Sequence, residues 1–183
     1  MNSRTLAEGK QFELAIERCC YQLIEDFENH TEIYLVGIQS GGVLLAERIE
    51  KKMSEIDTKL KIHLGKLDIT FYRDDFRKTS KPLRAHKNEM PFFIENKIVI
   101  IIDDVLYTGR SVSAAMSALN HYGRPEMIKL LVMVDRRFNR QIPIRADYSG
   151  IVVDALDEAY VEVEWKEKQG EDKIILFSQK VEL

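Results

Sequence analysis

The sequence predicts an α/β protein with a central, mostly parallel sheet flanked by helices, and three observations support this prediction. Apolar runs typical of strands alternate along the chain with apolar stripes at helical spacing. The runs at 98–102 and 128–134 are apolar without alternation, which indicates strands buried on both faces of a parallel sheet. With 183 residues and 45% hydrophobic side chains the chain is the size of one domain, so we expect a single domain over 1–183.

The first part of the chain contains a helix, a strand and a second helix. Apolar residues at helical spacing over 12–27 predict a surface helix that lies on the core. Residues 33–38 predict a short strand, and the glycines at 41–42 predict a turn from this strand into the next helix. We expect a long strand over 62–71, with a bulge at Gly65, which could form one arm of a hairpin.

A polar stretch at 72–96 precedes the second part of the chain. A loop of this length inside a compact domain is usually functional or partly disordered. After the strand at 98–102, apolar residues at helical spacing over 112–119 predict a helix that ends at Gly123 and Pro125. Three further apolar runs in an acidic tail are predicted as strands: 151–153, 161–165 and 174–177.

Composition limits the classes of function. The 27 Lys and Arg residues against 30 Asp and Glu residues give a net charge of −3, so any contact with RNA would need a local basic patch. The longest apolar run, Ile98 to Ile102, is far shorter than the roughly 20 residues of a membrane span, and the N-terminus lacks the order of a signal peptide. We therefore expect a cytoplasmic protein without membrane contact. The adjacent Cys19 and Cys20 are predicted to be reduced core residues.

The segment from 100 to 111 is the most informative. Two consecutive acids, Asp103 and Asp104, follow a buried strand, where ligands bind in open α/β sheets. Burial of both charges is unfavourable unless a ligand offsets it, and the vicinal hydroxyls of a ribose with a nearby Mg²⁺ would do so. Behind them, Thr108 to Ser111 form a turn into a helix whose backbone N–H groups can bind a phosphate. The segment therefore suggests a cradle for a ribose 5-phosphate, the alternative being an ordinary loop with a capped helix.

Four blocks of the chain extend this interpretation. The blocks at 68–75, 103–110, 134–136 and 143–148 stand in the order in which they occur in the pyrimidine operon attenuator/uracil phosphoribosyltransferase family of type I phosphoribosyltransferases, and the chain resembles that family from about Phe12 to Gly150. The resemblance implies the type I phosphoribosyltransferase fold, with a mobile lid at about 72–96 and a small hood made by the terminal segments. Members of the family are usually homo-oligomers, so a dimer or larger assembly is expected.

The resemblance also implies an activity. The expected reaction is transfer of a phosphoribosyl group from phosphoribosyl diphosphate (PRPP) to N1 of uracil, which yields UMP and pyrophosphate and uses Mg²⁺. Asp103 and Asp104 would hold the ribose hydroxyls, directly or through Mg²⁺, and we assign no protein ligand to the metal itself. Their expected role is to position the sugar and to favour the positive charge that develops on it. The residues expected to bind the 5-phosphate are Leu106, Tyr107, Thr108, Gly109, Arg110 and Ser111.

The family binds pyrophosphate at the turn formed here by Ser40, Gly41 and Gly42, which could otherwise be an ordinary turn between a strand and a helix. Many members have a basic residue where this chain has Gly41, so part of the pyrophosphate charge must be met elsewhere. The candidates for that charge lie in the expected lid, where they could also be a solvated charge run: Arg73, Arg77 and Lys78.

Two features concern the base. Purine enzymes of this type commonly have an aspartate at the position of Tyr107, so its absence favours uracil over hypoxanthine or guanine. The segment Val134, Asp135 and Arg136 matches the family's base-recognition segment, although Asp135 and Arg136 could instead form a local ion pair. Salvage of another base is the alternative within the same class.

A second class of function is an RNA-binding attenuator of pyrimidine operons that uses the pocket as a UMP sensor. The stretch from Arg124 to Arg145 holds six basic residues and two acidic ones, which would permit contact with leader RNA. However, Glu17, Tyr21 and Ile151 replace residue types expected at RNA-binding positions of the family. We therefore expect weak binding of leader RNA.

Overall fold

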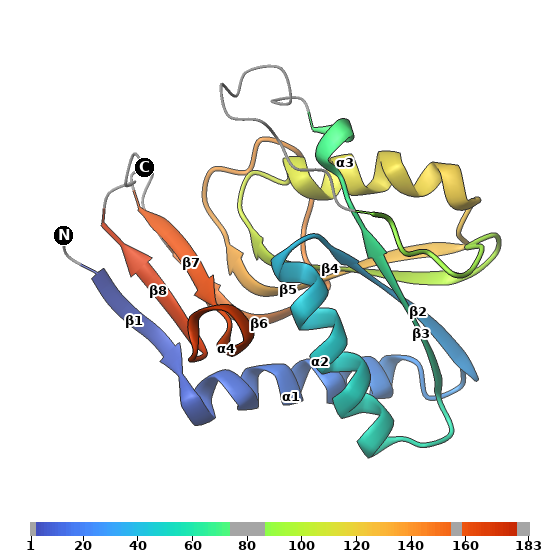
Figure 1. The fold of residues 1–183 in the computed structure, drawn as a ribbon, viewed down its shortest axis with the longest axis horizontal. Coiled ribbons are helices and arrows are strands. Elements are labelled where there is room, and N and C mark those ends of the chain that lie inside the picture. Colours follow the sequence, from blue (N-terminus) through green and yellow to red (C-terminus); the bar gives the residue numbers. More distant parts are fainter. Residues whose placement is uncertain (1–2, 74–86, 155–158, 179–183) are drawn as a thin grey trace.

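A five-stranded parallel sheet forms the centre of the computed structural model, which describes residues 3–73, 87–154 and 159–178 (Figure 1). The strand order is β3-β2-β4-β5-β6, and every neighbouring pair is parallel, as the sequence predicted. These strands are β2 (Glu32–Ile38), β3 (Lys61–Leu67), β4 (Ile98–Leu106), β5 (Met127–Arg136) and β6 (Tyr148–Val153).

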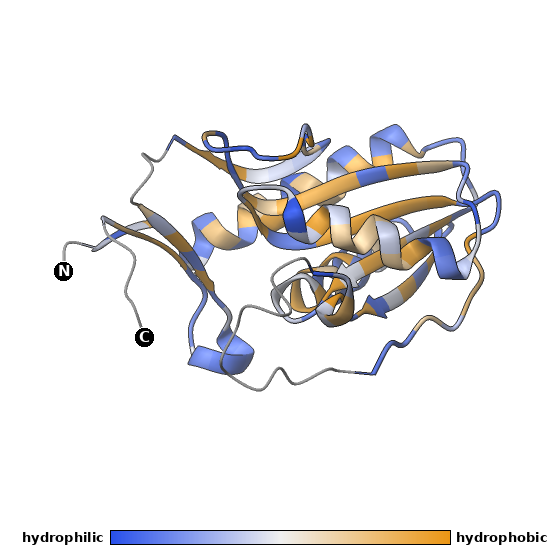
Figure 2. Cartoon of the chain, turned by 90° about the horizontal axis from the view of Figure 1, so that it is seen from above, coloured by the Kyte–Doolittle hydropathy of each residue, from blue (hydrophilic) through white to orange (hydrophobic). Residues whose placement is uncertain are grey.

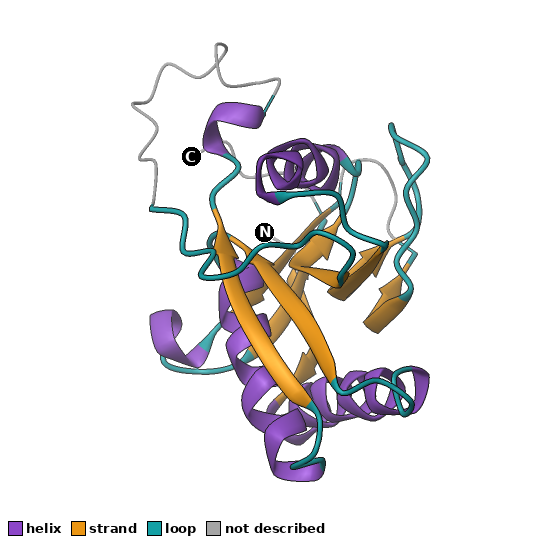
Figure 3. Ribbon diagram, turned by 90° about the vertical axis from the view of Figure 1, so that its right-hand side faces the viewer, coloured by secondary structure: helices purple, strands orange, loops and turns teal. Residues whose placement is uncertain are grey.

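Helices cover both faces of this sheet (Figures 1 and 3). The helices α1 (Gly9–Asp26) and α2 (Gly41–Ile56) pack on one face, and α3 (Arg110–Leu119) packs on the other, followed by a 3₁₀ turn at Asn120–Tyr122. The buried residues of these helices are apolar and share the two cores with residues of the strands, which are mostly hydrophobic along the main sheet (Figure 2).

The central strand β4 shows why its apolar run lacks alternation. Successive side chains of a strand point to opposite faces of the sheet. Ile100 and Ile102 belong to the core on the side of α1 and α2, while Val99 and Ile101 belong to the core beneath α3. Because both faces are covered, all four residues have to be apolar.

A smaller antiparallel sheet forms a hood beside the main sheet, at the end where both chain termini lie (Figure 1). Its strand order is β1-β8-β7, so the two ends of the chain build it together, as the family resemblance implied. Its elements are β1 (Ser3–Glu8), β7 (Tyr160–Glu164), the short helix α4 (Lys166–Gln169) and β8 (Lys173–Phe177). The sequence did not reveal β1, because five of its six residues are exposed or half-buried and leave no apolar pattern.

The strand predicted over 62–71 is shorter than expected. β3 ends at Leu67, and the Asp68 carboxylate accepts a hydrogen bond from Thr70 N at 2.7 Å, which opens a 3₁₀ turn at Thr70–Tyr72. The predicted bulge at Gly65 is wrong, since the parallel register with β2 is continuous through it. Gly65 instead makes room for Met90, whose Sδ would lie 2.5 Å from a Cβ at this position.

Among the described residues, the predicted hairpin is limited to one antiparallel bridge between Lys66 and Glu89. Of the expected lid, residues 74–86 lie outside the described part of the chain.

Cys19 and Cys20 are buried and unbonded to each other, as predicted, and burial raises their pKa values to about 11 and about 12. Of the helices in the described ranges, none has the length and apolar character needed to cross a bilayer.

Candidate functional site

The two acids lie on the central strand of the sheet. β4 continues through them to Leu106, so the strand does not end before Asp103 as the sequence had indicated. Only 8% of Asp103 is exposed, and its Oδ1 accepts a hydrogen bond from Asp104 N at 3.0 Å. Oδ1 of Asp104 accepts one from Val105 N at 2.8 Å. The strand thus fixes both carboxylates near its carboxyl end.

Burial disfavours the ionised form of both carboxylates. It raises the pKa of Asp103 well above its usual value, and the neighbouring charge of Asp104 raises it further. Burial also raises the pKa of Asp104. A ligand that brings hydroxyl donors or positive charge to the pair would stabilise its ionised form.

A cleft of about 650 Å³ opens above the two acids, at the carboxyl ends of the parallel strands. This is the place where open α/β sheets bind ligands, and the volume suits a small molecule of nucleotide size. Its walls come from the turn before α2, the end of β4, the start of α3 and the hood.

The predicted phosphate loop lines this cleft along its whole length, from Leu106 to Ser111. Gly109, the last residue before α3, has a φ of +88°, a conformation that glycine adopts without strain. The loop is supported from behind, because the backbone N–H groups of Gln141 and Ile142 both donate to the Thr108 carbonyl, at 3.0 and 3.1 Å. Arg110 Nε donates to Gln141 Oε1 at 2.6 Å and ties the same two segments together.

The start of α2 and the start of α3 reach the cleft from different sides. Ser40 is the N-cap of α2 and Gly109 is the N-cap of α3, and both residues line the cleft. Neither N-cap residue caps its helix with its own side chain, and at α3 the hydroxyl oxygen of Thr108 accepts a hydrogen bond from Arg110 N at 3.3 Å. The remaining N–H groups of each first turn can bind an anion, so the cleft offers two anion sites with a pair of carboxylates between them.

The two glycines of the first turn have different surroundings. A Cβ at Gly41 would lie 1.9 Å from Asp104 Oδ2, so the carboxylate occupies the space of a side chain at this position. A Cβ at Gly42 would lie 2.3 Å from the carbonyl oxygen of Ile102, so here the backbone itself is in contact. Ser40 and Gly41 line the cleft, whereas Gly42 lies against β4 behind it.

The predicted base-recognition segment reaches the cleft through one residue. Val134 is fully buried, and Asp135 forms an ion pair with Arg140 at 2.5 Å. Arg136 lines the cleft, where its guanidinium carbon lies 4.0 Å from the centre of the Tyr107 ring. The ion pair considered between Asp135 and Arg136 is therefore replaced by one with Arg140, whose side chain also donates to the Tyr107 carbonyl.

Of the three cations expected to cover the site, Arg73 lines the cleft. Its charge acts on Asp103, whose pKa it lowers against the larger effect of burial. Arg77 and Lys78 lie outside the described residues.

The hood supplies a wall that the sequence did not predict. The strand β7 and the helix α4 follow the acidic pair by more than 50 positions, and nothing in their local pattern points to a site. The hood residues that line the cleft are Tyr160, Val161, Glu162, Val163, Trp165, Lys168 and Gln169.

Comparison with solved structures shows the fold. A hypoxanthine phosphoribosyltransferase from Staphylococcus aureus matches with a TM-score of 0.69 and 20% identity, over 98% of this chain and 93% of that one. The enzyme of the same name from Trypanosoma cruzi matches with a TM-score of 0.68 and 15% identity, over 97% of both chains.

Sequence comparison gives a closer relationship. The bifunctional protein PyrR of Enterococcus faecalis strain OG1RF is 38% identical over 176 residues, which are 96% of this chain and 97% of that protein. The PyrR protein of Bacillus cereus is 40% identical over 168 residues, 90% of this chain and 92% of the relative. Residues 2–168 match the sequence model of the phosphoribosyl transferase domain. The chain therefore belongs to the phosphoribosyl transferase domain family and, within it, to the PyrR proteins.

Proposed function

We propose that this phosphoribosyltransferase transfers the phosphoribosyl group of PRPP to N1 of uracil and releases UMP and pyrophosphate. The observation that carries the proposal is the position of the acids Asp103 and Asp104 between the starts of α2 and α3 in one cleft. PRPP has the matching order of groups, because its ribose hydroxyls lie between a 5-phosphate and a pyrophosphate. The loop from Leu106 to Ser111 would bind the first anion, and Ser40 and Gly41 the second.

In this arrangement the two acids would stabilise the positive charge that develops on the ribose during the transfer. When the bond between C1 and the pyrophosphate oxygen breaks, its electron pair leaves with pyrophosphate and positive charge develops on the ribose. Asp103 and Asp104 are fixed by the strand and need no reorganisation to stabilise that charge. The free electron pair of uracil N1 then forms the new bond, and the N1 proton passes to water.

The donor set fits Mg²⁺. Carboxylate oxygens are ligands that Mg²⁺ prefers, and it usually takes one or two of them from the protein and the remainder from phosphates and water. Asp103 and Asp104 supply two such groups in the cleft. In the residues that the structure describes, there is no cluster of three or more metal-binding side chains. When bound, Mg²⁺ would neutralise charge on the pyrophosphate.

The surroundings of Tyr107 favour uracil as the acceptor. A purine enzyme of this type commonly uses an aspartate here, whereas this position presents an uncharged ring with the Arg136 guanidinium over it. The nearby Asp135 carboxylate is held by Arg140. This wall therefore presents no free carboxylate like the one that the purine enzymes commonly use, which favours a pyrimidine acceptor.

A panel of bases tests the acceptor. The protein is incubated with PRPP, Mg²⁺ and uracil, hypoxanthine or guanine, and pyrophosphate release is measured. Uracil should be used with the highest kcat/KM, and preferential use of a purine would contradict the proposal.

The site is tested separately with Asp104→Asn, which should lower kcat by about 100-fold or more while the protein stays folded. The exposed Asp154, which lies outside the cleft-lining set, provides the control variant Asp154→Asn, and this should keep full activity. Full turnover by Asp104→Asn would exclude the site.

The relatives are named bifunctional proteins, and the second function that we considered for this chain is binding of leader RNA. The basic residues between Arg124 and Arg145 do not form one unpaired patch. Arg137 pairs with Asp154 at 2.7 Å, and Lys129 pairs with Asp26 at 2.9 Å. Because Arg137 and Lys129 are already paired with acids of the same chain, we propose that the protein binds leader RNA only weakly.

A further inference from the structure

One end of the cleft lacks a cation from its own turn. Ser40 and Gly41 carry no charge, and a longer side chain at Gly41 would collide with the Asp104 carboxylate. Pyrophosphate placed there would meet backbone N–H groups on one side and a carboxylate on the other. A highly charged anion in a partly buried site needs a positive group to offset its desolvation.

Lys168 brings a positive charge to this place from the hood. It lines the same cleft as Ser40 and Gly41, and its side chain is exposed. Within the described ranges, its Nζ forms no hydrogen bond or ion pair.

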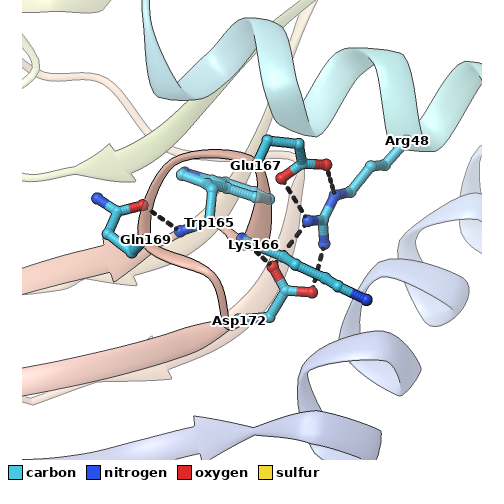
Figure 4. A network of polar contacts seen from close by, with 6 residues as sticks. All are labelled: Arg48, Trp165, Lys166, Glu167, Gln169 and Asp172. Carbon is cyan, nitrogen blue, oxygen red and sulfur yellow. Dashed lines mark hydrogen bonds and ion pairs between the residues drawn. The ribbon is translucent and has the colours of Figure 1, made fainter.

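Arg48 holds the hood segment in this position (Figure 4). It donates to both carboxylate oxygens of Glu167, at 3.0 and 2.7 Å, and to both of Asp172, at 2.9 and 2.7 Å. Its guanidinium carbon lies 5.0 Å from the centre of the Trp165 ring. Arg48 lies about two helical turns after Gly41 on α2, so the clamp holds α4 alongside the first turns of that helix. Lys168 follows Glu167 directly and is positioned by the same clamp.

Two other residues of α4, Gln169 and Lys166, differ in orientation. Gln169 accepts a hydrogen bond from Trp165 N through Oε1 at 2.9 Å, which leaves its amide nitrogen as a donor, and Gln169 also lines the cleft. Lys166 extends to the opposite side of α4, past Asp172 (Figure 4), and is absent from the described lining of the cleft. The short helix therefore contains one lysine at the site and one directed away from it.

We propose that Lys168 is the cation that binds the pyrophosphate group of PRPP, in place of a basic residue at position 41. This inference rests on the proposed function for the identity of the donor. Negative charge on the pyrophosphate grows as its bond to C1 breaks and the electron pair stays with the leaving oxygen. An ammonium at this position therefore stabilises the leaving group more strongly than the bound donor.

The test compares Lys168→Ala, Lys168→Arg and the matched control Lys166→Ala. Binding of magnesium pyrophosphate and of UMP is measured by calorimetry, because neither measurement depends on turnover. Lys168→Ala should weaken pyrophosphate binding by about 10-fold or more, as expected for a lost charge-assisted hydrogen bond. Its affinity for UMP should stay within about twofold of the wild type, and Lys168→Arg should retain most of the pyrophosphate affinity. Lys166→Ala should match the wild type in both measurements.

Two results would overturn the inference. One is pyrophosphate binding by Lys168→Ala within about twofold of the wild type, and the other is an equal loss in Lys166→Ala. Equal melting temperatures of the variants would confirm that each one is folded. If the wild type did not use uracil, the proposed acceptor would fall, while the pyrophosphate measurements would still decide the role of Lys168.

Discussion

Gly41 and Gly42 are neighbours in the sequence, but a side chain at each position meets a different obstacle. At position 41 the obstacle is the carboxylate of Asp104, which can turn away only by giving up its hydrogen bond from Val105 N, whereas at position 42 it is the backbone of β4, which cannot move aside. Gly41 therefore contributes to the site and Gly42 to the fold. The same pair of residues looked equivalent in the sequence.

Gly41→Ala and Gly42→Ala separate these roles. Gly41→Ala should force the Asp104 side chain to turn and should lower kcat/KM for PRPP by about 10-fold or more, with little change in melting temperature. Gly42→Ala should destabilise the protein by about 2 kcal/mol or more, because a methyl group is forced against a carbonyl oxygen. Steady-state kinetics and thermal unfolding of both variants measure the two effects. Equal stability losses would contradict the distinction.

The buried Asp103 predicts a stability cost that depends on pH. Its folded pKa is raised above the unfolded value, so the folded state loses stability as the pH rises from the unfolded pKa of about 3.9 through the folded pKa. Asp103→Asn removes this cost, and its Oδ1 can still accept the hydrogen bond from Asp104 N. The variant should melt about 3 °C or more above the wild type at pH 8, while activity falls. This gain should vanish near pH 4.

Asp154→Asn provides a control of opposite sign. The Arg137 guanidinium lowers the pKa of Asp154, so the ionised carboxylate of the wild type contributes stability above the unfolded pKa. Because the pair is exposed, Asp154→Asn should leave the melting temperature at pH 8 unchanged or slightly lower than that of the wild type. A lower melting temperature for Asp103→Asn at pH 8 would show that the buried charge is already compensated within the protein.

At the scale of elements, the hood and the sheet are joined by one arginine of α2. Arg48 contacts two acids of the hood and lies over Trp165 (Figure 4). It also lies over the ring of Phe12, which comes from α1. This one side chain therefore links α1, α2 and the hood. A matched surface pair exists one turn further along α2, where Lys52 lies 3.1 Å from Glu17.

Arg48→Ala should lower the free energy of unfolding by about 2 kcal/mol or more, because it leaves the partly buried Asp172 without its partner, breaks the exposed pair with Glu167 and removes contacts to two aromatic rings. It should also weaken pyrophosphate binding, since Lys168 loses its support. Lys52→Ala removes an exposed pair and should change little. Chemical denaturation and pyrophosphate titration of both variants check this, and equal effects would exclude Arg48 as the clamp.

At the scale of the whole molecule, charge decides which partners the protein can hold. The net charge is −3, and two arginines of the basic stretch, Arg137 and Arg140, are paired with acids in the fold. Arg18 of α1 donates to the Gly150 carbonyl on β6, so α1 and β6 lie side by side. The homo-oligomer implied by the family stays a prediction.

This charge distribution predicts weak RNA binding. A pyrimidine leader transcript should bind with a Kd of about 10⁻⁶ M or weaker at physiological salt, in the range of non-specific electrostatic binding. UMP should not strengthen it. Filter binding with and without UMP at two salt concentrations measures this. Nanomolar binding that depends on UMP would show that the paired arginines exchange their partners for phosphates.

The sequence by itself determined the parallel sheet, the turns that lead into α2 and α3, and the loop from Leu106 to Ser111, for which phosphate binding stays a prediction. These features depend on residues close together in the chain: a run buried on both faces, two acids, and a turn into a helix. Only the tertiary structure decided that Asp135 pairs with Arg140, that β3 stops at Leu67, and that the hood completes the cleft. The reason is distance along the chain. Arg48 and Glu167 are 119 positions apart, and no local pattern of polarity records a contact between segments that meet only when the sheet and hood pack together.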